Sequence, residues 1–239
     1  MLSWSDDAAI LTSRPFGENS VIVEVFSRGQ GRHAGVVRGG ASRKVAPTLQ
    51  PGAQVHVTWK ARLNEHLGSF TVEPVRSRAA QAMSNRLALA GLNAVTSLLV
   101  RVLPEREAHA PLYDRTVNLL DLLGQPAVWP LAYLRWEQAL LGEMGFAMDL
   151  SACAVRGVNE DLAFVSPKTG RAGIREGPGE WIDRLLPPPP VFAAQGHADA
   201  PQPVLALGPT WSLIQYRLTH VLADRPMHAR LPAVVYSLS

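Results

Sequence analysis

The sequence predicts an α+β protein, in which a small five-stranded β-barrel is followed by a helical domain that carries a small irregular hairpin module. Two observations predict this architecture. Short β-branched segments separated by Gly- and Pro-rich turns fill the first third of the chain, and apolar residues recur at helical spacing from about residue 80. We therefore expect a β-domain at residues 1–79 and a helical domain at residues 80–239, with an irregular insert at about 149–207.

Five short strands are expected in the first domain. The clearest covers residues 54–63, where polar and apolar residues alternate without a break, a pattern typical of a half-buried antiparallel strand. Trp59 falls on its apolar side, so we interpret it as a core residue rather than a base-stacking platform. A five-stranded barrel of this size is typically an OB-fold, whose strands and loops often bind single-stranded nucleic acid. The other expected strands are Ala8–Ser13, Asn19–Phe26, His33–Val37 and Ser69–Val75.

Three helical stretches are expected in the second domain. The first carries apolar residues at helical spacing from Met83 to Val102, and the second runs from about Pro111 to Leu123. The third begins after Pro126 and ends at Gly145. Pro near the start of a helix and Gly past its end match the usual asymmetry of helix termini.

The rest of the chain is expected to be irregular, apart from a last helix at about Thr210–Ala223. A hairpin is predicted around Pro167–Gly170, a rigid polyproline stretch at Pro187–Pro190 and a mobile segment at 193–203. The single cysteine, Cys153, excludes a disulfide framework and fits a reducing cytoplasm. The sequence has no long apolar run, which argues against a membrane span.

Positive charge is concentrated near the start of the chain. Residues 1–80 carry ten basic and six acidic side chains, although the whole chain of 239 residues has a net charge of only +3. Concentrated positive charge without carboxylates is the electrostatic footprint of a phosphate-backbone partner; the alternative is a solvated basic surface with no ligand. Between Val25 and Asn64 there is no Asp or Glu, and the candidate phosphate-binding residues are Arg28, Arg32, Arg38, Arg43, Lys44, Lys60 and Arg62.

Motifs that carry catalysis are absent from the sequence. It contains no GxxxxGK[ST] phosphate loop, no G-x-S-x-G elbow and no H-E-x-x-H pair, and its seven His residues are scattered. We therefore expect no catalytic residue, no metal and no cofactor, and we interpret the chain as a binding protein. An enzyme that uses scattered His and Asp residues stays an alternative.

Several short motifs resemble those of the RecO family of recombination and repair proteins. They are Gly17–Glu18, Ser27–Gly31, Gly40–Lys44 and Leu49–Pro51, followed by the string WEQALLGEMGFAMDLSACAVRG. The resemblance covers nearly the full chain, and it rests on the order and spacing of these motifs. The resemblance implies DNA binding, annealing of complementary strands, and cooperation with RecR and single-stranded-DNA-binding protein in loading recombinase during homologous recombination and DNA repair. It also implies a cytoplasmic, nucleoid-associated protein that binds single- and double-stranded DNA but no membrane.

One departure from the family pattern concerns zinc. Many members carry two C-x-x-C pairs in the hairpin module, whereas here Cys153 is followed by Arg156 at the partner position. The second pair would fall near Ile174–Gly177, and neither end is Cys. We therefore expect a degenerate, zinc-finger-like module without a metal.

A second function is compatible with the sequence. The chain would then be an interaction adaptor, whose helical domain binds a partner peptide while DNA binding is secondary. In the family that peptide is the acidic, aromatic tail of single-stranded-DNA-binding protein. The candidate contacts, which are equally well explained as solvated charges on helix faces, are Arg86, Arg101, Arg106 and Arg115.

Overall fold

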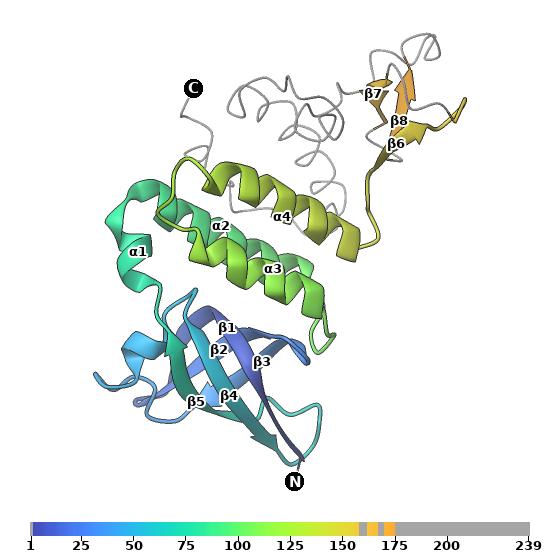
Figure 1. The fold of residues 1–239 in the computed structure, drawn as a ribbon. Helices are drawn as coiled ribbons and strands as arrows, with labels where there is room; N and C mark the ends of the chain where they lie inside the picture. Colours follow the sequence, from blue (N-terminus) through green and yellow to red (C-terminus); the bar gives the residue numbers. More distant parts are fainter. Residues whose placement is uncertain (1, 158–161, 167–169, 175–239) are drawn as a thin grey trace. The chain divides into compact units, whose positions relative to one another are not determined.

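The computed structural model describes residues 2–157, 162–166 and 170–174 (Figure 1). By contacts between residues, the chain divides into two units, Met1–Trp129 and Pro130–Ser239. The predicted domain boundary at residues 79 and 80 stays a prediction. The following expected segments lie outside the described residues: Pro187–Pro190, 193–203 and Thr210–Ala223.

The first unit begins with a closed β-barrel whose strand order is β1-β2-β3-β5-β4. Its neighbouring strands pair antiparallel, except for β3 and β5, which meet in parallel at Val36 and Ser69 (Figure 1). This topology is typical of an OB-fold and confirms the predicted five-stranded barrel. The strands are β1 (Leu2–Phe16), β2 (Ser20–Ser27), β3 (Gly31–Val37), β4 (Gln54–Ala61) and β5 (Ser69–Arg76).

Strand β1 is much longer than the expected Ala8–Ser13, because it pairs with two neighbours. Its first half, Leu2–Ala9, pairs with β4, and its second half, Ala8–Phe16, pairs with β2. The register shifts between Ile10 and Thr12, as at a β-bulge, where a strand bends and twists more strongly. The shift lies within the pairing with β2, just beyond Ala9, where the pairing with β4 ends, so the strand bends where it passes from one neighbour to the other.

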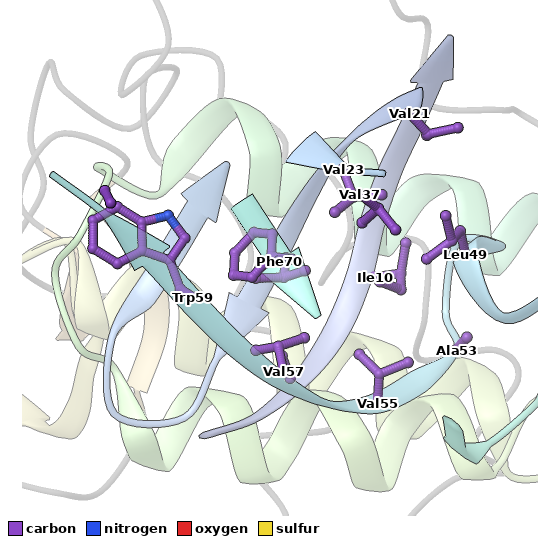
Figure 2. Packing of buried hydrophobic residues seen from close by; sticks show 13 residues of the cluster. Ile10, Val21, Val23, Val37, Leu49, Ala53, Val55, Val57, Trp59 and Phe70 are labelled. Carbon is purple, nitrogen blue, oxygen red and sulfur yellow. The ribbon is translucent and has the colours of Figure 1, made fainter. Parts of the chain in front are cut away.

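The barrel core is built by the alternating side chains that point inward from these strands (Figure 2). Val23, Val55 and Val57 are completely buried, and full burial of such a side chain stabilises the fold by roughly 1.5–3 kcal/mol. Trp59 is only 1% exposed, which confirms its predicted place in the core. Its indole Nε1 donates a hydrogen bond to the carbonyl oxygen of Leu67 at 3.0 Å, so its polar atom is satisfied inside the barrel.

Helices α1 (Ala79–Ser84), α2 (Arg86–Val102) and α3 (Ala110–Asp121) follow in the same unit. The apolar pattern predicts one continuous helix through residue 85, and this is wrong. Asn85 is extended, and its side-chain oxygen accepts a hydrogen bond from the backbone N–H of Ala88 at 2.6 Å. Asn85 is thus the N-cap of α2, a position that Asn favours because its side chain satisfies an exposed N–H group.

The second unit holds most of α4 (Trp129–Glu143) and a small sheet of order β6-β8-β7. Strands β7 and β8 pair antiparallel, which confirms the predicted hairpin. Among the described residues, no group of three or more His, Cys, Asp or Glu side chains could hold a metal, and no helix is long and apolar enough to cross a bilayer. The absence of zinc stays a prediction. The strands are β6 (Asp149–Cys153), β7 (Leu162–Val165) and β8 (Arg171–Ile174).

Candidate nucleic-acid interface

A hollow of about 640 Å³ lies on the barrel of the first unit. Its lining comes from the end of β1, the start of β2 and the turn between them, from the ends of β3 and β4 with residues that follow them, and from the start of β5. Three of the predicted phosphate-binding residues, Arg38, Lys60 and Arg62, line it together. The volume falls within the roughly 300–1,000 Å³ that is common for ligand sites.

The topology of the barrel explains why these three residues meet. Ser69 at the start of β5 pairs on one side with Val36 of β3 and on the other with Lys60 of β4. Arg38, two residues beyond Val36, is thereby brought to the same region as Lys60, although 22 positions separate them in the sequence. Arg62 follows directly after β4, which ends at Ala61.

The electrostatics of the hollow favour an anion. Arg38, Lys60 and Arg62 are all exposed, and in the part of the chain that the structure describes none of the three makes an ion pair or a side-chain hydrogen bond. The described residues that line the hollow include no Asp or Glu. When such cations neutralise the phosphates of a nucleic acid, the counterions condensed on those phosphates are released, and this release is the main driving force of nonspecific nucleic-acid binding.

The basic pair Arg43 and Lys44 is exposed but does not line the hollow. It lies in a connection of successive turns, in which the backbone N–H of Ser42 donates to the carbonyl oxygen of Gly39 at 3.1 Å. The connection continues into a 3₁₀ helix, Ala46–Leu49, whose last residue is buried in the barrel core. The pair therefore sits on an anchored loop, separate from the hollow.

Arg28 is already paired within the first unit. Its Nε and Nη2 atoms donate to the two carboxylate oxygens of Asp114 on α3, each at 3.0 Å. The pairing lowers the pKa of Asp114 and raises the pKa of Arg28, chiefly through the hydrogen bond between them. We therefore leave Arg28 out of the proposed interface.

Arg32 is also engaged within the first unit. Its side chain is only 14% exposed, and its Nη1 atom lies 2.8 Å from Glu24. Its Nε atom donates to the carbonyl oxygen of Leu103 at 2.9 Å, and Nη2 lies 3.5 Å from Glu105. This geometry favours a structural role, in which Arg32 holds the connection between α2 and α3 against the barrel.

The four arginines predicted to bind a partner peptide do not form one patch. Arg86 and Arg101 lie at opposite ends of α2, about 22 Å apart along the helix axis, and Arg115 is exposed on α3. Arg106 donates through Nη1 to the carbonyl oxygen of Asn64 and through Nη2 to that of His66 at 3.3 Å. Since His66 lines the hollow, Arg106 positions a loop of the candidate DNA site.

Two notable residues of the first unit, one in the hollow and one outside it, were not anticipated from the sequence. Phe16, the last residue of β1, lines the hollow with half of its surface exposed. Arg78 is buried and joins the end of the barrel to α3 through Asp121. No local pattern marks either residue, because a strand end and a buried arginine are both defined by neighbours that are distant in the sequence.

Comparisons with known proteins give a consistent result. Residues 1–78 match the family model "Recombination protein O N terminal", and residues 83–200 match "Recombination protein O C terminal". A protein of Roseobacter denitrificans is 55% identical over 226 residues, which cover 95% of this chain and 94% of that protein. A protein of Jannaschia sp. is 51% identical over 238 residues, or 99% of this chain and 96% of that protein. Both bear the name DNA repair protein RecO.

Proposed function

Because the chain belongs to the RecO family of DNA repair and recombination proteins, we propose that it binds DNA, anneals complementary strands and helps to load recombinase onto single strands coated with single-stranded-DNA-binding protein. Membership of the family supports a role in DNA repair and recombination. The protein acts in DNA repair and recombination, as a mediator and not as an enzyme. We further propose that it anneals strands and loads recombinase, and that its partners are RecR and single-stranded-DNA-binding protein.

The observation that carries DNA binding is the group of three exposed cations around the hollow. Lys60 lies on β4, and Arg38 and Arg62 directly follow β3 and β4, so the barrel fixes the backbone positions of all three before any ligand arrives. A backbone that is already ordered loses less conformational entropy on binding than a mobile tail would. Strand ends and loops on one region of an OB-type barrel are also where single strands are commonly bound.

Annealing requires no catalytic group. Two DNA strands repel each other through their phosphates, and a protein that neutralises some of this charge lowers the barrier to their encounter. The hollow supplies cations for a first strand, and the exposed pair Arg43 and Lys44 supplies further positive charge outside it. The proposed annealing activity therefore rests on two separate basic groups of the barrel.

The test is the salt dependence of binding to a labelled single-stranded oligonucleotide. Lys60→Ala combined with Arg62→Ala should weaken binding for all sequences alike and lower the salt slope by roughly 0.7 for each phosphate that is no longer neutralised. The matched control is Arg86→Ala combined with Arg115→Ala, which removes the same charge from exposed helix positions. An equal change of slope in the two double variants would refute the assignment of binding to the hollow.

The same control variant tests the adaptor function. If the helical segment binds the acidic tail of single-stranded-DNA-binding protein, the removal of Arg86 and Arg115 should weaken binding of a peptide with that tail sequence. It should leave oligonucleotide binding unchanged. Tail binding that is unaffected would remove these two arginines from the partner site, and binding of DNA would remain the supported function.

A further inference from the structure

An aromatic ring stands at the rim of the basic hollow. Phe16 is the last residue of β1 and pairs with Ser20 across the β1–β2 turn. Gly17 follows it with a φ of +67°, a left-handed conformation that lets the chain turn back directly after the ring. Phe16 therefore occupies a defined position on a short hairpin and not on a long loop.

Phe16 is far more exposed than the aromatic residues inside the barrel. Phe26, Trp59 and Phe70 are at most 5% exposed, whereas Phe16 is 50% exposed. Within the residues that the structure describes, Phe16 makes no ring contact, while Trp59 and Phe70 both pack in an aromatic cluster. A half-exposed ring that packs against no other ring is a hydrophobic surface that is available for stacking.

The neighbours of Phe16 leave room for a flat ligand. Gly39 lines the same hollow and carries no side chain that would fill it. At Gly39 even an added Cβ atom would meet nothing within 4 Å. The hollow thus combines a half-exposed aromatic ring with the cations Arg38, directly after β3, and Lys60, near the end of β4.

We propose that Phe16 is a base-stacking platform, and that the hollow binds an unpaired base of single-stranded DNA while Arg38 and Lys60 hold the adjoining phosphates. The proposal rests on the proposed DNA binding and specifies the class of DNA. Bases in a duplex are stacked on each other and do not present a free face, whereas an aromatic side chain can stack on every base of a single strand. The hollow is therefore selective for single strands but tolerant of sequence.

Stacking and phosphate binding respond differently to salt. Neutralised phosphates release counterions, so their contribution falls as salt rises. A base that stacks on Phe16 is uncharged and releases none. Removal of the ring should therefore lower affinity by a similar factor at every salt concentration, whereas removal of Lys60 and Arg62 should change the slope.

The experiment uses the full chain, a thymidine oligonucleotide and a strand of equal length with abasic sites, which keeps the phosphates but has no bases. The wild type should bind the thymidine strand more tightly. Phe16→Ala should weaken that binding by about 5- to 150-fold, the range measured for one stacked base, with an unchanged salt slope. Its affinity for the abasic strand should equal that of the wild type.

Two further variants complete the test. Phe16→Tyr keeps the ring and should bind as the wild type does. Val75→Ala removes an apolar side chain that is similarly exposed on β5 but does not line the hollow, and it should have no effect. If Phe16→Ala binds both strands as the wild type does, the stacking role is refuted, while a changed slope in the Lys60 and Arg62 double variant would still support DNA binding. If the salt slope of the double variant is unchanged as well, the proposal that the hollow binds DNA is also refuted.

Discussion

Arg78 and Asp121 form a partly buried ion pair that joins the end of the barrel to helix α3. The Nε atom of Arg78 donates to the Asp121 carboxylate at 2.7 Å, and Nη1 donates to the carbonyl oxygen of Gly52 at 3.0 Å. The Arg78 side chain is fully buried, and Asp121 is 28% exposed. Arg76 contacts the other carboxylate oxygen at 2.7 Å from a half-exposed position. Two arginines thus share one carboxylate at very different depths.

Replacement of Arg78 is expected to be strongly destabilising. Arg78→Met keeps much of the side-chain length but leaves the Gly52 carbonyl without its donor and Asp121 without its buried partner. Because Asp121 is partly exposed and keeps Arg76, we expect the free energy of unfolding to fall by about 1–3 kcal/mol, the usual cost of a buried acceptor left without its donor. Urea denaturation of the full chain measures this change.

The control for this prediction is Arg76→Ala, which removes a cation from the same carboxylate. Because Arg76 is 49% exposed, its ion pair is screened by solvent and should contribute less than about 1 kcal/mol. Equal destabilisation by the two variants would show that burial does not decide how much each arginine contributes through Asp121.

Much of the fold could be predicted because its signals are local. The unbroken alternation of β4 predicts a half-buried strand, and the Pro and Gly residues around α3 and α4 predict their ends. The first half of β1 could not be predicted because Asp6 interrupts the apolar side that Leu2 and Trp4 begin, and the pairing with β4 decides the structure instead. The break at Asn85 was missed because a single N-cap overrides the apolar stripe.

The candidate site was predicted less completely, for a related reason. Basic residue types could be read from the sequence, but their partners could not. Arg28 pairs with Asp114, 86 positions away, and Arg32 contacts Leu103, 71 positions away. Conversely, Arg38 and Lys60 share a hollow only because β3 and β5 meet in parallel.

The second prediction concerns the stability of variants at Arg106, a non-glycine residue in a left-handed conformation. Arg106 has a φ of +64°, which is unfavourable for a residue with a Cβ atom. Arg106→Gly and Arg106→Ala both remove the hydrogen bonds to Asn64 and His66, but only Gly adopts this φ without strain. The Gly variant should therefore be more stable than the Ala variant by about 1 kcal/mol in thermal denaturation. An Ala variant of equal or greater stability would show that the backbone is not strained there.

The third prediction concerns His33, which is buried among aromatic rings. Its ring centroid lies 4.8 Å from that of Trp59, and its Nδ1 atom donates to the carbonyl oxygen of Ala34 at 3.0 Å. Burial lowers the pKa of His33 below its ordinary 6.5, because the charged imidazolium is poorly solvated inside the barrel. The nearby Arg106 lowers the pKa further, while the Ala34 hydrogen bond and Glu105 oppose the shift.

The sign of the pH effect follows from this lowered pKa. Below about pH 6.5 the unfolded chain binds a proton at His33 that the folded chain does not bind, so stability falls as the pH drops through 6.5. His33→Phe should weaken this dependence between pH 7 and pH 5. A variant with the same pH profile as the wild type would show that His33 is not responsible.

Exposed His56 provides a control of opposite sign. Its Nδ1 atom lies 2.9 Å from Asp7, and the hydrogen bond between them raises the pKa of His56. The contribution of His56 to stability is therefore present below its unfolded pKa and is lost as the pH rises through the folded one. His56→Gln should make the decline in stability on acidification steeper, where His33→Phe makes it shallower.

The last prediction separates annealing from binding. Arg43 and Lys44 are exposed and lie outside the hollow, on a loop anchored by buried Leu49. A strand held in the hollow leaves this pair available to a second strand, whose approach requires positive charge beyond that which holds the first strand. Arg43→Ala combined with Lys44→Ala should therefore slow the annealing of complementary oligonucleotides more than it weakens affinity for one strand. Annealing rates are compared at saturating protein, with the Lys60 and Arg62 double variant alongside. Rates equal to those of the wild type would mean that the loop is a connector with solvated charges.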